Sequence, residues 1–302
     1  MTAIQPSMCR LVSPVHLTRL KRTQEFLGKG NDMEQTVVDY RVDDGVATVT
    51  LNRPDQLNAM TDGLMSGITS AVKQIEEDSS VRVLVLTGHG RGFCAGADLV
   101  GVAGSSADKN ASTESATDPD PGDTFNTAMR SLMNCPVPTI ARVNGAAAGG
   151  GFGLAMACDI TVASRSAFFV ATFGPNLGIV PDMGTTWNIP LRVGRARALG
   201  ITLLGDRISA QQAEDWGLIW QSVPDEDLDA AVSEIAEKFK RASPDAVVRI
   251  RETINESIHN SFSSQLDLEM EHQAVLIPKN MKAGAQAFLE KRVPTFSGDR
   301  RE

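Results

Sequence analysis

The spacing of hydrophobic and polar residues first predicts a β-hairpin, in the stretch that follows Met33. Residues 36–41 and 46–51 are rich in Val, Thr and Tyr, and Asp43-Asp44-Gly45 between them is typical of a hairpin turn. The second strand runs into Asn52-Arg53-Pro54, where proline cannot donate to the ladder and ends it. Two antiparallel strands are therefore expected here.

A helical period follows the hairpin. Four apolar residues are spaced by four, four and three positions, which places them on one buried face of a helix. They are Leu64, Ile68, Val72 and Ile75. Thr61 or Asp62 is the expected N-cap, because either side chain can accept a hydrogen bond from the first turn.

The next predicted strands are apolar almost without interruption, as in strands that are covered on both faces of a sheet. Residues 81–86 are the clearest example. Three more are expected over 136–143, 160–163 and 168–171. The alternation of these strands with helical segments predicts an α/β fold for the first two-thirds of the chain.

The last third of the chain is predicted to be mostly helical. One expected helix spans 210–216, with Ser209 as its N-cap and Gly217 as the residue that ends it. The other helices, including an earlier one, are expected over 125–133, 195–204, 226–241, 244–258, 262–276 and 281–289.

Two glycine-rich turns each follow an apolar strand and open a helical pattern. They cover residues 87–99 and 143–159, and the second has five glycines within nine positions. Glycine lets a backbone approach a ligand closely, and the free N–H groups at a helix start favour an anion. Two such turns can aim a pair of backbone donors at one oxygen, as acyl chemistry needs. A tightly packed helix beside a sheet is the alternative that these residues leave open.

Composition excludes several function classes. The chain has 302 residues with a net charge of −8, which argues against binding a nucleic-acid backbone. It contains no apolar run of about 18 residues, so no membrane span is expected. The glycine-rich turns match neither nucleotide-binding motifs nor a serine-hydrolase elbow. The four cysteines are widely spaced, which favours free thiols in a cytoplasmic protein without a metal site.

Two segments differ in composition from the rest. Residues 1–32 are basic, and we interpret them as a disordered extension or an upstream start before Met33, with a transit peptide as the alternative. Residues 100–123 contain few large apolar residues and are expected to form a surface loop, either covering a pocket or simply disordered.

Three motifs together resemble those of the enoyl-CoA hydratase/isomerase (crotonase) family, over roughly residues 35–300. They are Leu51-Asn-Arg-Pro54 with Asn58-Ala59, Gly92-Phe-Cys-Ala-Gly-Ala-Asp-Leu99, and Asn144-Gly-Ala-Ala-Ala-Gly-Gly-Gly-Phe-Gly-Leu-Ala155 with Cys158-Asp159-Ile160. The C-terminal part, including Glu214-Asp-Trp-Gly-Leu-Ile-Trp220, is similar to the 1,2-epoxyphenylacetyl-CoA isomerase branch of that family.

The resemblance implies an α/β spiral of ββα units over 33–240 and a C-terminal helical region over 241–302 that packs in a homotrimer or a hexamer. It implies an acyl-CoA substrate and no separate cofactor, since coenzyme A is the carrier of the substrate. Fatty-acid or phenylacetate metabolism is the implied setting.

The resemblance also implies a site. The thioester oxygen is expected between the N–H groups of Ala95 and Gly150, where negative charge develops when an α-proton leaves. The implied substrate-binding residues are Cys94, Ala95, Gly96, Ala97, Asp98, Leu99, Gly149 and Gly150. The alternative interpretation of Asp98 is a helix cap. The alternative interpretation of Cys94 is a packing residue.

One departure from the family changes the expected reaction. The hydratases of the family hold water with two glutamates, whose positions fall on Gly153 and Gly174 in this chain. Glycine can neither take nor give a proton, so the acid left in this region is Asp182. We interpret Asp182 as a proton shuttle, with capping of the next helix as the alternative.

The favoured function is therefore an acyl-CoA isomerase that shifts a double bond or opens a strained ring. A 2-enoyl-CoA hydratase that uses Asp182 alone is the second hypothesis, and an acyl-CoA hydrolase is the third. A CoA-binding pseudoenzyme is the alternative outside the enzymes.

Overall fold

The computed structural model describes residues 23–24, 36–99, 121–297 and 300. Most of the expected extension over 1–32 lies outside these residues, as does the expected loop over 100–123 up to residue 120. Two details of those expectations are wrong. Thr23–Gln24 form strand β1 within the segment expected to be disordered, and helix α3 already begins at Pro121 and runs to Met133.

Within the described residues, the larger sheet has seven strands in the order β1-β2-β3-β4-β6-β8-β11. The strands after β1 are β2 (Val38–Asp43), β3 (Val46–Leu51), β4 (Val83–Gly88), β6 (Thr139–Val143), β8 (Ile160–Ser164) and β11 (Gln221–Val223). The first three strands are antiparallel, whereas β3 to β11 are parallel. The carboxyl ends of parallel strands meet at one edge, and both glycine-rich turns begin there, after β4 and β6.

The hairpin between β2 and β3 is confirmed. Its two turn residues, Asp44 and Gly45, both have a positive φ, at +45° and +77°. Two left-handed residues in succession match the twist of the flanking strands, and this is why the sequence Asp-Gly favours the turn. The ladder pairs Asp43 with Val46 and continues to the pair of Val38 with Leu51.

Helix α1 (Asp62–Glu77) confirms the predicted stripe, because Leu64, Ile68, Val72 and Ile75 are all buried. The Thr61 hydroxyl accepts a hydrogen bond from the Leu64 N–H at 3.3 Å. Thr61 is therefore the N-cap, and Asp62 lies in the first turn, where its charge complements the helix dipole.

A second sheet has four strands among the described residues, in the order β10-β9-β7-β5. They are β10 (Ile208–Ser209), β9 (Phe168–Val170), β7 (Ala146–Ala148) and β5 (Gly92–Cys94). Strands β5 and β7 lie inside the two glycine-rich turns and were not expected as strands. Two or three residues show no measurable period in a sequence, so only the tertiary pairing reveals them.

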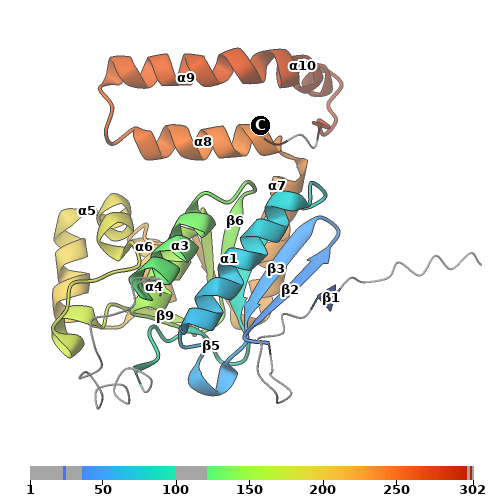
Figure 1. Cartoon of the computed structure of the whole chain (residues 1–302). Coiled ribbons are helices and arrows are strands. Elements are labelled where there is room, and N and C mark those ends of the chain that lie inside the picture. Colours follow the sequence, from blue (N-terminus) through green and yellow to red (C-terminus); the bar gives the residue numbers. More distant parts are fainter. Residues whose placement is uncertain (1–22, 25–35, 100–120, 298–299, 301–302) are drawn as a thin grey trace, which may run out of the picture.

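Helices cover both faces of the larger sheet. Helices α1 and α3 lie together on one face (Figure 1), and α7 (Leu228–Arg241) packs on the other against β4, β6 and β8. The larger apolar cluster lies under α1 and α3 and includes Leu86 and Phe152, which are fully buried. A smaller cluster under α7 includes Ile140 and Val232.

Helix α5 is longer than expected. It spans Thr185–Leu204, whereas the predicted helix covers only 195–204. Pro190 and Gly194 lie inside it, and Gly194 has a non-helical φ of 75°, so two helical pieces meet at a kink. Helix α6 (Ala210–Asp215) starts as predicted, since the Ser209 hydroxyl accepts from the Gln212 N–H at 3.2 Å.

The C-terminal helices form an arm that stands apart from the sheets (Figure 1). The arm consists of α8 (Pro244–Glu256), α9 (Phe262–Leu276) and α10 (Lys282–Leu289). Large apolar side chains on it are exposed, including Ile254, Phe262, Met270 and Phe288. Exposed large apolar side chains gathered on one part of a chain favour an interaction surface. No helix in the described ranges combines the length and the apolar character that a membrane crossing requires.

Candidate functional site

The two glycine-rich turns meet side by side. Strands β5 and β7 pair in parallel, with Gly92 opposite Ala146 and Cys94 opposite Ala147. The chain leaves β5 into residues 95–99 and leaves β7 into helix α4 (Gly150–Ala157). This pairing therefore brings the end of the first turn next to the start of the helix in the second.

Glycine is required where these turns touch. A Cβ atom on Gly151 would lie 2.1 Å from the Cys94 carbonyl oxygen, which no real contact permits. A Cβ atom on Gly96, which has a φ of +92°, would lie 2.8 Å from the Ala148 oxygen and 3.3 Å from the Gly150 nitrogen. Close packing of the two turns is therefore confirmed, and it places Gly96 beside the Gly150 N–H. Ligand binding at this point stays a prediction.

The expectation that Ala95 donates to a thioester oxygen is wrong. The Ala95 N–H already donates to the Leu57 carbonyl at 3.0 Å. The Gly149 N–H is also paired, with the Val170 carbonyl at 2.9 Å. Neither amide is available to a ligand in this arrangement.

Two other backbone amides stay available. Met60 forms a parallel bridge beside Ala97: its N–H donates to the Gly96 oxygen at 2.7 Å, and the Asp98 N–H donates to its oxygen at 3.1 Å. Successive amides of an extended chain alternate in direction, so the Ala97 N–H points away from Met60. Within the described ranges, neither the Ala97 N–H nor the Gly150 N–H has a hydrogen-bond acceptor.

Asn58 holds the first turn in place. Its side chain is fully buried, and its Oδ1 accepts from the Arg53 N–H at 2.9 Å. Its Nδ2 donates to the His89 oxygen at 3.0 Å and to the Gly92 oxygen at 2.9 Å. Asn58 also has a φ of 58°, a left-handed conformation that asparagine tolerates better than most residues.

Replacement of Asn58 by alanine is expected to lower the free energy of unfolding by roughly 2–4 kcal/mol, because buried backbone groups lose their partners. Chemical denaturation monitored by circular dichroism measures this change. The exposed Asn176 provides the control, and its alanine variant is expected to unfold like the wild type. Equal midpoints for the two variants would contradict the role assigned to Asn58.

Asp182 lies in a turn of two left-handed residues. Met183 has a φ of 52° and Gly184 a φ of 69°. The Asp182 carbonyl accepts from the Thr185 N–H at 3.0 Å and from its hydroxyl at 2.6 Å. The N-cap of α5 is Gly184, without any side-chain cap. The carboxylate of Asp182 therefore does not cap α5, and the helix-cap interpretation of this residue is wrong.

The surroundings of Asp182 raise the pKa of its carboxyl group. Partial burial of the carboxyl group raises the pKa of Asp182 above its ordinary value, and a hydrogen bond from its own backbone N–H only partly opposes this. The residue is nevertheless exposed to solvent. A carboxyl group that is half desolvated and still reachable suits proton exchange with a ligand.

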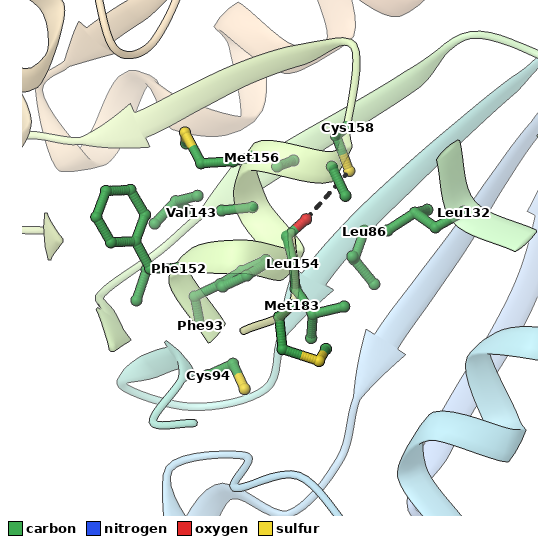
Figure 2. Close-up of a cluster of buried hydrophobic side chains, with 14 of the residues drawn as sticks. Leu86, Phe93, Cys94, Leu132, Val143, Phe152, Leu154, Met156, Cys158 and Met183 are labelled. Carbon is green, nitrogen blue, oxygen red and sulfur yellow. Dashed lines mark hydrogen bonds between the residues drawn. The ribbon is translucent and has the colours of Figure 1, made fainter. Parts of the chain in front are cut away.

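Met183 connects Asp182 to the start of α4. A Cβ atom on Gly153 would lie 2.5 Å from the Met183 oxygen and 2.6 Å from its Cβ. A Cβ atom on Gly150 would lie 3.1 Å from the Met183 Cγ. Figure 2 shows Met183 next to this helix, with Cys94 and Phe93 beneath the same turn. The residue that follows Asp182 thus packs on the first turn of α4, and no side chain fits at position 153.

The remaining residues that were expected to bind substrate differ in their exposure and in their contacts. Cys94 is fully buried, and this burial raises the pKa of its thiol to about 12, so it is a packing residue and does not reach a ligand. Asp98 forms an ion pair with Arg53, at 2.8 Å. Leu99 is half exposed and Ala97 is exposed, whereas Gly96 is buried between the turns.

A cavity of about 600 Å³ lies at the other end of α4, between α5 and α8. It is lined by Met156, Cys158, Trp187, Arg192, Ile250 and Arg251, among others, and contains none of Ala97, Gly150 and Asp182. We therefore place the chemistry at the start of α4, where the free amides lie. No cluster of three or more potential metal ligands occurs among the described residues.

Comparison with known proteins identifies the family. The family model described as Enoyl-CoA hydratase/isomerase matches residues 41–299. The chain is 42% identical to 1,2-epoxyphenylacetyl-CoA isomerase of Escherichia coli (strain K12) over 262 residues, which cover 85% of this chain and 97% of that protein.

Solved structures with a similar fold carry hydratase names. The crystal structure of an enoyl-CoA hydratase from Polaromonas sp. JS666 superposes with a TM-score of 0.79 at 31% identity, covering 86% of this chain and 99% of that one. An enoyl-CoA hydratase from Bacillus anthracis gives a TM-score of 0.78 at 34% identity, with coverages of 87% and 100%. The parallel sheets and the C-terminal helices therefore form the crotonase-like fold that the motifs predicted, and the chain belongs to the enoyl-CoA hydratase/isomerase (crotonase) family.

Proposed function

We propose that this protein is an acyl-CoA isomerase that shifts a double bond or opens a strained ring in a CoA-bound acyl group. The observation that carries the proposal is the packing of Met183, the residue after Asp182, on the first turn of α4 at Gly150 and Gly153. The Gly150 amide at the start of this turn has no acceptor within the described residues. The 42% identity to 1,2-epoxyphenylacetyl-CoA isomerase supports the same reading, and favours a substrate with an aromatic or ring-derived acyl group from phenylacetate metabolism.

The N–H groups of Ala97 and Gly150 are the proposed oxyanion donors. Both lack an acceptor within the described part of the chain, and Gly96 lies between them. Donors fixed by the backbone cost no reorganisation when the thioester oxygen gains negative charge. The Ala97 amide takes the role that the family resemblance led us to expect of Ala95.

Asp182 is the proposed base and acid. Its carboxylate takes a proton from one carbon of the acyl chain, and the electron pair of the broken C–H bond forms the enolate, whose charge falls on the thioester oxygen. The same carboxyl group then returns the proton at another carbon or to a ring oxygen. One residue suffices for this because the proton is only moved, and no water is added.

A second candidate is a 2-enoyl-CoA hydratase, which the hydratase names of the similar structures favour. The blocked position at Gly153 argues against it, since Met183 fills the space in which a water-holding side chain would stand. Incubation with a panel of unsaturated and epoxidised acyl-CoAs in D₂O, followed by mass spectrometry, separates the candidates. We expect deuterium uptake without addition of water, because the exposed carboxyl group of Asp182 exchanges the proton that it holds with the solvent before it returns one to the substrate. A product heavier by one water would establish the hydratase, free CoA thiol a hydrolase, and binding without exchange a pseudoenzyme.

The raised pKa of Asp182 makes a prediction about pH. The catalytic form is the carboxylate, so kcat/KM is expected to fall on the acid side with a midpoint above the ordinary aspartate pKa. The folded state also holds this proton more tightly than the unfolded chain does. Ionisation of Asp182 therefore makes folding less favourable as the pH rises through the folded pKa. A pH–rate profile checks the midpoint, and an acid limb at or below the ordinary aspartate value would contradict the assignment.

We also propose that the chain assembles as a homotrimer or a hexamer through the C-terminal arm. Phe262 and Phe288 on this arm are 81% and 83% exposed, which is unusual for phenylalanine in an isolated subunit. Light scattering coupled to gel filtration is expected to give three or six times the chain mass. A cytoplasmic location is part of the proposal, and the free buried thiols of Cys94, Cys135 and Cys158 support it.

A further inference from the structure

Helix α4 carries the proposed donor, the Gly150 N–H, at its first residue. Its sequence has a low intrinsic tendency to form a helix. Three of its first four residues are glycine, and glycine is the weakest helix former after proline. The helix has only eight residues, all of them buried, and none has a polar side chain. Its direction therefore depends on what holds its ends, because a helix this short is not stable by itself.

Arg192 of α5 holds the last turn directly. Its Nη2 donates to the Met156 oxygen at 2.7 Å and to the Cys158 oxygen at 3.3 Å. Its Nη1 donates to the Leu218 oxygen at 3.2 Å. The Met156 and Cys158 carbonyls lie at and just beyond the C-terminal end of α4, where a helix lacks internal donors and its dipole favours a cation.

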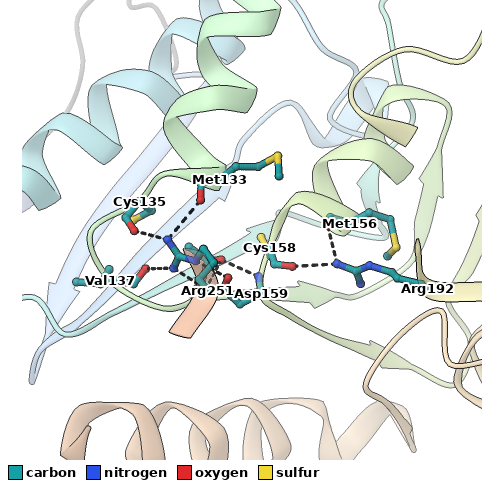
Figure 3. A network of polar contacts seen from close by, with 9 residues as sticks. Met133, Cys135, Val137, Met156, Cys158, Asp159, Arg192 and Arg251 are labelled. Atoms are coloured by element: carbon teal, nitrogen blue, oxygen red, sulfur yellow. Dashed lines mark hydrogen bonds and ion pairs between the residues drawn. The ribbon is translucent and has the colours of Figure 1, made fainter. Parts of the chain in front are cut away.

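Arg251 of α8 holds the residue that follows the helix. Its guanidinium pairs with both carboxylate oxygens of Asp159, each at 2.7 Å. The same guanidinium donates to the oxygens of Cys135 and Val137 at 2.6 Å and 2.9 Å. Asp159 also accepts from the Thr139 N–H at 2.8 Å. Figure 3 shows the two guanidinium groups on either side of Cys158 and Asp159.

The two arginines hold one end of α4, and the other end carries the donor. Eight residues of helix span about 12 Å, so a small rotation at Cys158 moves the Gly150 N–H. Catalysis is sensitive to such movement, since a misplacement of about 1 Å can cost on the order of 10²-fold in rate. Bidentate guanidinium contacts fix direction better than a lysine ammonium does.

We propose that Arg192 and the Arg251–Asp159 pair are positioning residues that set the direction of the Gly150 N–H by holding the far end of α4. This rests on the proposed function, because it assumes that the Gly150 amide polarises the thioester. Arg251 belongs to the C-terminal arm, whose neighbouring residues Ile250 and Ile254 are exposed. The attachment of the arm and the geometry of the donor are therefore coupled through one side chain.

The test uses the full-length protein and cinnamoyl-CoA, whose conjugated thioester absorbs at longer wavelength when its carbonyl is polarised by hydrogen bonds. Arg192→Lys and Arg251→Lys keep the positive charge but lose the forked contacts, and Arg192→Met and Arg251→Met remove both. Arg249→Met is the matched control. Arg249 lies on the same helix as Arg251 with nearly the same side-chain exposure, 12% against 13%, and pairs with Asp245 at 2.8 Å.

We expect the wild type and the Arg249→Met control to show the same red shift on binding the probe. The lysine variants at positions 192 and 251 are expected to bind cinnamoyl-CoA with similar affinity but with a smaller shift, and kcat is expected to fall about 10- to 100-fold. The methionine variants are expected to lose more of the red shift than the lysine variants. This comparison is made for the folded protein in each sample.

The inference would be overturned if the lysine variants kept the full red shift of the bound probe and the wild-type kcat, and differed only in thermal stability. Arg192 and Arg251 would then be ordinary stabilising residues. A wild-type protein that binds the probe with no shift would contradict the proposed function itself, and this inference with it. The two failures are distinguishable because only the second involves the wild type.

Discussion

Replacement of Asp182 by asparagine is expected to reduce kcat for isomerisation by about 10²–10⁴-fold, the usual contribution of a positioned general acid or base. The amide keeps the size of the carboxyl group but cannot take a proton from carbon. The carboxylate of Asp182 does not cap α5, whose N-cap is Gly184, so the fold loses nothing that the helix needs. Steady-state kinetics with an isomerisable acyl-CoA, together with the dissociation constant of that substrate, measures the effect.

Two further results accompany this prediction. The dissociation constant is expected to stay close to that of the wild type, because the proposed binding contacts are backbone amides and do not include the Asp182 carboxylate. The control is Asp206→Asn, at an exposed aspartate in the turn after α5, and it is expected to keep full activity. An Asp182→Asn variant with wild-type kcat would rule out the proton shuttle and return Asp182 to a structural role.

Replacement of Gly151 by alanine is expected to give the second-largest effect. The new Cβ would lie 2.1 Å from the Cys94 carbonyl oxygen and 2.7 Å from its carbon, which are backbone atoms that cannot swing aside. The two glycine-rich turns must separate, so the donors at Ala97 and Gly150 no longer converge. We expect a loss of about 10²-fold or more in kcat and a loss of about 1–3 kcal/mol in the free energy of unfolding.

The matched control for this change is Gly200→Ala in α5. A Cβ atom at that position meets nothing within 4 Å, and alanine favours a helix by about 0.5–1 kcal/mol over glycine. Its variant is expected to be as active as the wild type and slightly more stable. Kinetics and thermal unfolding of both variants check the pair. If Gly151→Ala retained full activity, the close contact of the two turns could not be what aligns the donors.

Most of the fold could be predicted where a period or a cap is strong. The apolar stripe of α1, the turn at Asp44 and Gly45, and helix α9 over residues 262–276 all follow from local spacing and local caps. The short strands β5, β7, β10 and β11 could not be predicted, because two or three residues gain their strand character from partners far away in the chain. The first half of α5 was missed because Pro190 and Gly194 are helix breakers that tertiary packing overrides here.

Less of the candidate site could be predicted from the sequence. Glycine spacing indicated where two backbone segments approach each other. The raised pKa of Asp182 comes from its partial burial in the folded chain. The choice between Ala95 and Ala97 as donor depends on which backbone N–H groups already donate to the carbonyl oxygens of Leu57 and Met60. Glycine spacing carries no information about that. The contact of Met183 with Gly153 joins residues thirty positions apart and has no signal in the spacing of either segment.

The most direct test of the account is a crystal structure with an unreactive acyl-CoA analogue bound, in which two distances are measured. We predict that the thioester oxygen lies about 2.7–3.1 Å from the amide nitrogens of both Ala97 and Gly150, the range of effective oxyanion donors. We also predict that the Asp182 carboxylate lies within contact of the acyl carbons next to the thioester. A thioester oxygen bound away from these amides, or a carboxylate directed away from the acyl chain, would contradict the account.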